Sequence, residues 1–394
     1  MEDVVLAGAC RTPIGSFHGA LSSLSAPRLG AVVIREALRR TGIAPDQVDE
    51  VIMGNVIQAG VGQAPARQAA RFAGLPDHVE TMTVNKVCGS GLKAVMLAAQ
   101  AIQTGDAEIV VAGGMESMSN APYLLDKARS GYRMGNGEIV DALYRDGLVN
   151  VYDNALMGNH AERCARECSI PREAQDAFAI TSYSRAQEAQ RNGAFAKEII
   201  PVEIKGRKDD VVRVSEDEDV TKTNFEKIPS LRPAFEKDGT ITAANASKIS
   251  DGAAAMVVLS ARKAAQLGIA SQARLLRQAS FAKAPEWFTT APADAIAKVL
   301  KKSGLAVADI DLFEINEAFA VVALAVNKLA GLDPAKVNVH GGAIALGHPL
   351  GASGARILVT LLHALERHGK KRGLAALCIG GGEASGVIVE RLSS

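Results

Sequence analysis

Apolar and polar positions follow two different patterns along the chain. Short apolar runs typical of buried strands occur just after the N-terminus and at residues 48–56 and 310–315. Residues 37–44 and 299–306 have the pattern of amphipathic helix ends stopped by glycine, and residues 172–192 are also helical in pattern. The order of these segments predicts alternating strands and helices, and therefore an α/β protein.

The pattern also repeats within the chain. Three pairs of segments match in residue type and occur in the same order, namely residues 37–44 with 299–306, 90–93 with 353–356, and 113–116 with 380–383. Matches in this order predict two homologous halves, each an α/β unit with a central sheet sandwiched by helices. We expect the two halves to pack face to face and to place their glycine-rich turns at the shared boundary.

One long segment interrupts the repeat. The predicted organisation is an N-terminal α/β half (residues 1–119 plus 249–271), an inserted loop domain (120–248) and a C-terminal α/β half (272–394). The insertion carries a charged stretch at residues 205–222 with an acidic run inside it, which we interpret as a solvated loop. An inserted loop unit is also a natural place for substrate contacts.

Composition excludes several classes of function. The 394 residues are too many for one ordinary core, and 48% hydrophobic with 22% charged residues is typical of a soluble globular protein. A net charge of +1 without a basic cluster argues against a nucleic-acid partner. No apolar run reaches the roughly 18 residues of a membrane span, and the N-terminus has no targeting pattern, so we expect a cytoplasmic protein without membrane association. Five unevenly spaced cysteines predict free thiols rather than a disulfide framework.

The first candidate for chemistry is Cys88. An apolar helix is predicted to begin just after it, and small residues, Gly89 and Gly91 among them, surround the turn. Unpaired amides and the helix dipole at such a position favour a thiolate and could hold a developing oxyanion. A buried structural cysteine is the alternative, but glycines that let other backbone come close are not needed for simple packing.

Three further residues lie in comparable settings. His348 sits between Gly347 and Pro349 at the repeat equivalent of the Cys88 turn, where an imidazole can take a thiol proton. Cys378 ends an apolar strand before a run of three glycines, so it is either an acid/base or a small core residue. Asn316 lies where a strand gives way to a helix, and it either orients a water or oxyanion or caps the helix.

Two weaker patterns are set aside. His160, Cys164 and Cys168 recur every four residues on one helix face, but three such ligands span about 12 Å, too far for one ion. We interpret them as packing residues and predict no metal site. The glycine-rich end of the chain lacks the spacing and the later acidic residue of a dinucleotide-binding turn.

Taken together, the motifs resemble those of the thiolase family. The signature segments are residues 85–92, 316–320, 341–354 and 378–382, and further similar stretches are residues 112–119, 231–235 and 242–255. The resemblance covers nearly the whole chain in the family's order. It implies a five-layered αβαβα fold made of two similar halves with an inserted loop domain.

The resemblance also implies roles for residues. Cys88 would be the acylated nucleophile, His348 its activator, and Cys378 the group that moves the α-proton of a second acyl-CoA. Asn316, through a water, would join His348 in one oxyanion hole, and the amides of Cys88 and Gly380 would form another. Positions that match the lining of the coenzyme A or acyl pocket are Ser247, Phe235, Ala318, Phe319 and Met157.

The same resemblance implies partners. Acyl-CoA and coenzyme A would be substrates and products, with no separate cofactor. A homotetramer built from dimers is expected, and the apolar helix at residues 94–101 and the insertion are candidate assembly surfaces. The closest likeness is to the short-chain branch that forms acetoacetyl-CoA, with departures at Leu156, at residues 287–288 and at Val220, where Lys222 is the nearest base.

Three alternatives remain open. A degradative 3-ketoacyl-CoA thiolase of broader chain length would use the same mechanism. A β-ketoacyl synthase is less favoured, because those enzymes use two histidines where this chain has His348 and Cys378. A non-catalytic acyl-CoA or lipid-binding homologue is the third, and the four intact catalytic positions argue against it.

Overall fold

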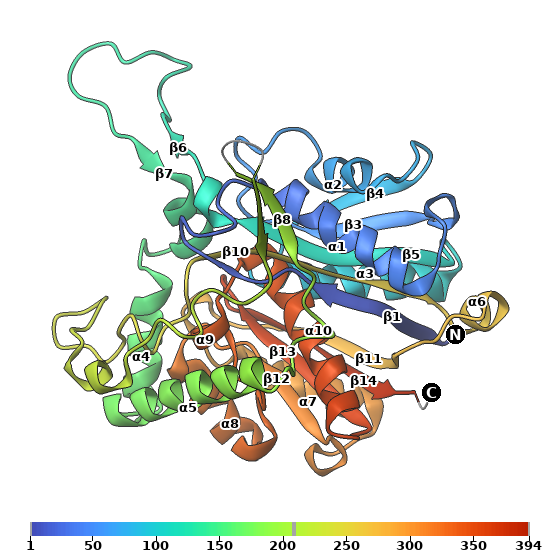
Figure 1. Cartoon of the computed structure of the whole chain (residues 1–394). Coiled ribbons are helices and arrows are strands. Elements are labelled where there is room, and N and C mark those ends of the chain that lie inside the picture. The colour runs from blue at the N-terminus through green and yellow to red at the C-terminus, as the bar shows by residue number, and fades with distance from the viewer. Residues whose placement is uncertain (1, 207–209, 393–394) are drawn as a thin grey trace.

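The structure is a computed structural model that describes residues 2–206 and 210–392 (Figure 1). Its helices are α1 (Ala26–Thr41), α2 (Pro65–Ala73), α3 (Ser90–Thr104), α4 (Met157–Glu167), α5 (Arg172–Arg191), α6 (Ala261–Leu267), α7 (Ala291–Ser303), α8 (Ala320–Ala330), α9 (Ala343–Leu346) and α10 (Leu350–Arg367). Its strands are β1 (Val4–Arg11), β2 (Gly15–Ser16), β3 (Glu50–Gly54), β4 (Glu80–Val84), β5 (Ile109–Ser117), β6 (Tyr123–Leu124), β7 (Val140–Asp141), β8 (Val202–Lys205), β9 (Val211–Val214), β10 (Ser250–Ser260), β11 (Ala273–Ala282), β12 (Leu312–Ile315), β13 (Arg372–Ile379) and β14 (Glu383–Arg391).

The predicted helix ends are confirmed. Gly42 follows α1 with a φ of 69°, and Gly304 follows α7 with a φ of 71°. This left-handed conformation carries almost no penalty for glycine, which is why the helices stop there. Basic side chains occupy the last turn of both helices, where they interact favourably with the helix dipole.

The repeat appears as two equivalent sets of strands in one sheet. The strand order is β12-β13-β14-β11-β1-β10-β5-β3-β4, with parallel pairing of β3 with β4 and β5, and of β12 with β13. The sheets of the two halves meet where β1 and β11 pair through two residue pairs, Val5 with Arg274 and Leu6 with Ala273. The sheets of the two halves are therefore joined along one edge. The sequence pattern alone indicated one sheet in each half and did not predict this connection.

The expected five layers are present. One apolar core packs α1 and α2 against the N-terminal sheet, and another packs α7 and α8 against the C-terminal sheet. Between the two sheets lies a third core that contains α3 and α10 (Figure 1). Because α3 is in this central layer, most of the apolar side chains of residues 94–101 are buried within the chain, which contradicts the expectation that this helix is an assembly surface.

The insertion packs mainly against the second half. Helices α4 and α5 contact α8, and α5 also contacts α9, while the β6–β7 hairpin extends away from the body (Figure 1). The charged stretch is not simply solvated. Asp217 is buried and accepts a hydrogen bond of 2.7 Å from the buried Arg11, whose charge needs a counter-ion. Residues 207–209 of that stretch lie outside the described residues.

The exact domain boundaries stay a prediction. Strand β10 begins two residues after residue 248 and pairs with β5 and β1, so the chain returns to the first half at that point. In the part of the chain that the structure describes, every helix is too short or too polar to cross a membrane.

Candidate active site

Cys88 lies in a tight turn between β4 and α3. Val87 has a positive φ of 44°, and Gly89 is the N-cap of α3. The Ser90 hydroxyl accepts from the Lys86 amide (2.8 Å) and donates to the Val87 carbonyl (2.6 Å), which closes the turn. A Cβ atom on Gly89 would lie 2.3 Å from Ile379 Cδ1, so the side chain at the end of β13 packs directly against the Cys88 turn.

His348 is positioned at the start of α10. Its Nδ1 lies 2.6 Å from the hydroxyl of Ser353, and that hydroxyl donates its single proton to the Pro349 carbonyl at 2.8 Å. The Ser353 oxygen must therefore accept from His348, which assigns the proton to Nδ1. The Nε2 atom is left with a free lone pair, the form that a general base needs.

Asn316 contacts the same imidazole. Its Nδ2 lies 3.5 Å from both ring nitrogens of His348, and its Oδ1 is buried without a partner among the described residues. The N-cap of α8 is Phe319, so the interpretation of Asn316 as a plain helix cap is wrong. An unpaired buried amide oxygen beside an imidazole is typical of a site that holds a water.

Two glycines bring α3 and α10 together. A Cβ on Gly354 would lie 2.4 Å from the Leu92 amide nitrogen, and one on Gly91 would lie 2.9 Å from the Gly351 carbonyl oxygen. The first turns of the two helices thus meet backbone to backbone. Because Cys88 precedes one helix and His348 the other, this contact sets the distance between them.

The buried carboxylate of Glu116 also holds backbone segments of the site in place. It accepts hydrogen bonds from the Val56 amide (3.0 Å), the Asn55 side chain (2.7 Å) and the Gly351 amide (2.8 Å). One carboxylate therefore ties the loop after β3 to the start of α10.

Cys378 and Gly380 approach from the C-terminal half. Cys378 is fully buried near the end of β13, and burial, followed by negative charge on Cys88, raises its pKa. A backbone hydrogen bond from Gly380 acts on Cys88 and lowers its pKa. The Lys86 ammonium pairs with the Glu383 carboxylate and so links the Cys88 turn to the glycine turn.

The charge states of Cys88 and His348 in the free protein differ from those that the sequence suggested. Burial raises the pKa of Cys88 to about 11, more than the Gly380 and Cys88 backbone hydrogen bonds lower it. Burial and the positive charge of Arg356 lower the pKa of His348 to about 3. Burial thus outweighs the expected stabilisation of a thiolate by the helix start. In the free protein the pair is a neutral thiol and a neutral imidazole.

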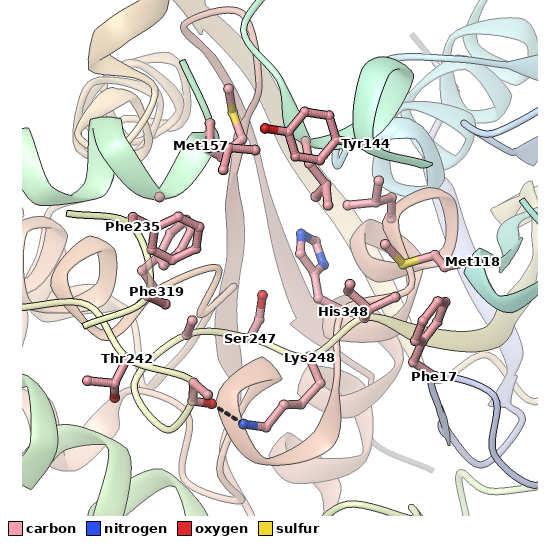
Figure 2. A pocket seen from close by; sticks show the side chains of 18 of the residues that line it. Phe17, Met118, Tyr144, Met157, Phe235, Thr242, Ser247, Lys248, Phe319 and His348 are labelled. Atoms are coloured by element: carbon pink, nitrogen blue, oxygen red, sulfur yellow. Dashed lines mark hydrogen bonds between the residues drawn. The ribbon is translucent and has the colours of Figure 1, made fainter. Parts of the chain in front are cut away.

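A pocket of about 620 Å³ opens onto His348. Figure 2 shows the imidazole pointing into the space between Phe235 and Phe319 on one side and Met118 on the other. Four of the five predicted ligand contacts line this pocket, namely Met157, Phe235, Ser247 and Phe319. The fifth, Ala318, supports it from behind, since its carbonyl accepts from the Ser247 amide at 2.9 Å.

Cys88 lies beside the same pocket. It packs against the cluster that contains Leu350 and Met118, and both of these residues line the pocket. A second, more polar cavity of about 1000 Å³ is lined by Val87, Met157 and Gly380, so it reaches the Cys88 turn from the other side of Met157. The structure therefore gathers the predicted catalytic residues around one junction.

The structure locates the positions at which the sequence departs from the short-chain branch. Leu156 lines the pocket, Val220 is fully buried, and Phe288 is buried with its ring edge-on to His160 at a centroid distance of 6.5 Å. Sequence reasoning missed Ser353 and Lys248. Both lie inside the recognised segments, but their roles depend on spatial neighbours that no local pattern reveals.

Comparison with known families decides the membership of the chain. The model for the thiolase N-terminal domain matches residues 4–262, and the model for the thiolase C-terminal domain matches residues 269–391. The chain belongs to the thiolase family. The residues of the two matches span both halves of the repeat and the insertion, so this thiolase has the family's full architecture.

Individual relatives are similar over their full length. The acetyl-CoA acetyltransferase of Schizosaccharomyces pombe is 53% identical, with 99% of each chain covered. That of Escherichia coli K12 is also 53% identical, with 100% of each covered. Among solved structures, the acetyl-CoA acetyltransferase of Bacillus anthracis superposes with a TM-score of 0.97 at 43% identity, covering 100% of this thiolase and 99% of that chain. A thiolase of Ascaris suum in complex with coenzyme A gives a TM-score of 0.94 at 48% identity, covering 99% and 100%.

Proposed function

We propose that this thiolase catalyses the reversible Claisen condensation of two acetyl-CoA to acetoacetyl-CoA and coenzyme A. Full-length relatives named acetyl-CoA acetyltransferase at 53% identity support the substrate. The observation that carries the mechanism is the hydrogen-bond chain from Pro349 through Ser353 to His348, which leaves Nε2 free to accept a proton beside the Cys88 turn. Coenzyme A is substrate and product, and the proposed reaction needs no other cofactor.

The first half-reaction transfers an acetyl group to Cys88. His348 Nε2 takes the thiol proton as the sulfur attacks the thioester carbonyl, and the amides of Cys88 and Gly380 hold the oxyanion. The carbon–sulfur bond to coenzyme A then breaks, and the leaving thiolate takes the Cys378 proton. Acetyl-Cys88, protonated His348 and a Cys378 thiolate remain, so the net charge of the site does not change.

The second half-reaction forms the carbon–carbon bond. The Cys378 thiolate removes an α-proton from a second acetyl-CoA, while protonated His348 and a water held by Asn316 stabilise the enolate oxygen. The enolate carbon attacks acetyl-Cys88 and the Cys88–acyl bond breaks. Cys88 recovers its proton from His348, and all three groups return to their starting states.

Thiolysis of longer 3-ketoacyl-CoA substrates is the second candidate. Leu156 stands where the short-chain branch usually has histidine, and its side chain adds apolar surface to the pocket. Steady-state rates with 3-ketoacyl-CoA thioesters of increasing length would separate the two candidates, because only a broad-chain enzyme keeps kcat/KM high beyond four carbons.

Thiolytic cleavage of acetoacetyl-CoA, followed as loss of its enolate absorbance, tests the proposed reaction. Acetyl-CoA labelling and peptide mapping should place the acetyl group on Cys88. Cys378→Ala should still be acetylated but should neither exchange α-protons nor condense, and Cys88→Ala should not be acetylated. Absence of thiolysis in the wild-type protein would favour a binding function instead, and label found only on Cys10, Cys164 or Cys168 would refute the role of Cys88.

We further propose that the protein acts in the cytoplasm as a homotetramer of two dimers. Support for assembly comes from large apolar side chains that are exposed on the hairpin arm, which we define as residues 121–152. Examples are Tyr123, Met134, Ile139 and Tyr152. Several large apolar side chains left exposed on one segment are typical of protein–protein contacts.

A further inference from the structure

The 620 Å³ pocket presents one ammonium group. Among the described residues that line it, Lys248 is the only lysine or arginine, and Asp219 is the only acid. The Asp219 carboxylate is already paired, since it accepts from the Ser16 hydroxyl at 2.5 Å and lies 3.4 Å from the Lys222 ammonium. The uncompensated charge of the pocket is therefore positive and belongs to Lys248.

The Lys248 ammonium has only neutral neighbours. It donates to the carbonyl of the exposed Ala243 (Figure 2). It also lies 5.8 Å from the ring centroid of Tyr183. Within residues 2–206 and 210–392, no carboxylate lies within 4.0 Å of it. A cation held by a single carbonyl can exchange that contact for an anion, which forms a shorter and stronger hydrogen bond.

The backbone of Lys248 is fixed next to the catalytic base. Its carbonyl accepts from the His348 amide (3.1 Å) and from the Ser250 hydroxyl (3.0 Å). From that point the side chain runs to Ala243. The backbone of Lys248 is thus anchored beside His348, while the side chain carries the charge away from it to Ala243.

This offset matches the shape of the substrate. A coenzyme A thioester carries its acyl group on a long neutral pantetheine arm, and its pyrophosphate and 3′-phosphate lie at the other end. An apolar pocket with one outlying cation is complementary to such a molecule. Positions 220 and 222, the other candidates for a basic contact to coenzyme A, do not offer the same charge. Val220 is buried, and Lys222 is paired with Glu218 at 2.8 Å as well as with Asp219.

We propose that Lys248 binds a phosphate group of coenzyme A and so discriminates coenzyme A thioesters from the same thioesters on pantetheine. The inference rests on the proposed function and names a binding residue for it. On binding, a phosphate oxygen replaces the Ala243 carbonyl as acceptor from Nζ.

The test compares substrates that differ only in their phosphates. Thiolysis of acetoacetyl-CoA, acetoacetyl-dephospho-CoA and acetoacetyl-pantetheine is measured with the wild type, Lys248→Met and the matched control Lys222→Met. In Lys248→Met, the ratio of kcat/KM for the coenzyme A thioester to kcat/KM for the pantetheine thioester should fall about fivefold or more. The fall should come from a higher KM for the coenzyme A thioester. It should be kept in Lys222→Met.

The dephospho substrate then locates the contact. If Lys248→Met also lowers kcat/KM for acetoacetyl-dephospho-CoA, Lys248 contacts the pyrophosphate. If kcat/KM for that substrate is unchanged, Lys248 contacts the 3′-phosphate. An unchanged ratio in Lys248→Met, or a fall in Lys222→Met instead, would overturn the proposal. If the wild type cleaved none of the three thioesters, the proposed function would fail. Calorimetric affinities of the same variants for coenzyme A and pantetheine would then decide the role of Lys248 separately.

Discussion

At the scale of single residues, the site combines a thiol that is hard to ionise with an imidazole that is hard to protonate. Both effects arise from burial, which penalises the charged form of each group. In the proposed mechanism, the proton transfer from Cys88 to His348 is therefore coupled to acyl transfer instead of preceding it. In that mechanism, a developing oxyanion at the Gly380 amide would compensate for the imidazolium that forms at the same moment.

This arrangement predicts a specific pH dependence for Cys88. A pKa of about 11 means that the thiolate fraction in the free enzyme should rise about tenfold per pH unit between pH 7 and 9.5. Alkylation by iodoacetamide, measured as Cys88 modification by peptide mapping, should follow that rise without a plateau. Because the pKa of His348 is lowered to about 3, no step near pH 6 to 7 is expected. A plateau below pH 8 would instead indicate a preformed thiolate.

A second prediction concerns the tautomer of His348. Ser353→Ala removes the acceptor of the Nδ1 proton, so the imidazole can hold its proton on Nε2, where it cannot act as a base. We expect kcat to fall about 10- to 100-fold, by analogy with other residues that orient a histidine. Ser250→Ala is the matched control, because its hydroxyl contacts only the Lys248 carbonyl in this region and not the ring. Equal activity of the two variants would contradict the assignment.

The sequence predicted some of these residues and not others for a physical reason. Cys88 and His348 each adjoin a glycine, and Cys378 lies two residues before Gly380, so the sequence alone shows these side chains beside glycine-rich turns. Ser353 and Glu116 act on groups that belong to other segments, and their partners become known only when the chain is folded. The net effect of burial on Cys88 also depends on the fold, and burial raises the pKa of the thiol where the sequence alone favoured a thiolate.

At the scale of elements, the repeat was sufficient to predict two α/β halves but not how they join. The pairing of β1 with β11 involves strands from different halves, and nothing local to Val5 or Leu6 signals it. The same holds for the insertion, whose helices α4 and α5 pack on α8 of the second half. Contacts of this kind depend on surface complementarity between distant segments rather than on local propensity.

The crossing of α3 and α10 gives the element-scale prediction. Gly354→Ala places a methyl group 2.4 Å from the Leu92 amide nitrogen, so one helix must move away from the other. The cost of such overpacking is about 1–3 kcal/mol, and the same shift separates Cys88 from His348. Thermal unfolding should show a lower Tm, and kcat for thiolysis should fall more than tenfold, since small misplacements of reacting groups are costly.

Gly386→Ala is the matched control for this variant. It lies in β14, and a Cβ there would meet its nearest neighbour at 3.7 Å, an ordinary contact distance. Its Tm and kcat should stay close to those of the wild type. A Gly354→Ala protein with unchanged Tm and full activity would show that the helices adapt and that their close crossing does not position the site.

At the scale of the whole molecule, two separate surfaces are available for assembly. Strand β4 is the outer edge of the main sheet, and Met82 on it is 44% exposed. The hairpin arm carries Met134, which is 99% exposed, and Ile139, which is 67% exposed. A free edge strand pairs readily with another chain, and an exposed apolar arm favours burial against a partner. A dimer of dimers requires two such different interfaces.

Light scattering can therefore separate the two contacts. The wild type should have a mass about four times the 41.2 kDa of one chain at micromolar concentration. Replacing residues 126–138 of the arm by a short glycine–serine linker should leave a dimer, because the β4 edge is untouched. Met82→Lys should weaken the other contact, since a charge on an edge strand opposes edge-to-edge pairing. Combining the two changes should give a particle with the mass of a single chain.

A wild-type particle with the mass of one chain would rule out the assembly. A protein with the shortened arm that kept the full mass would show that the arm's apolar side chains have another purpose.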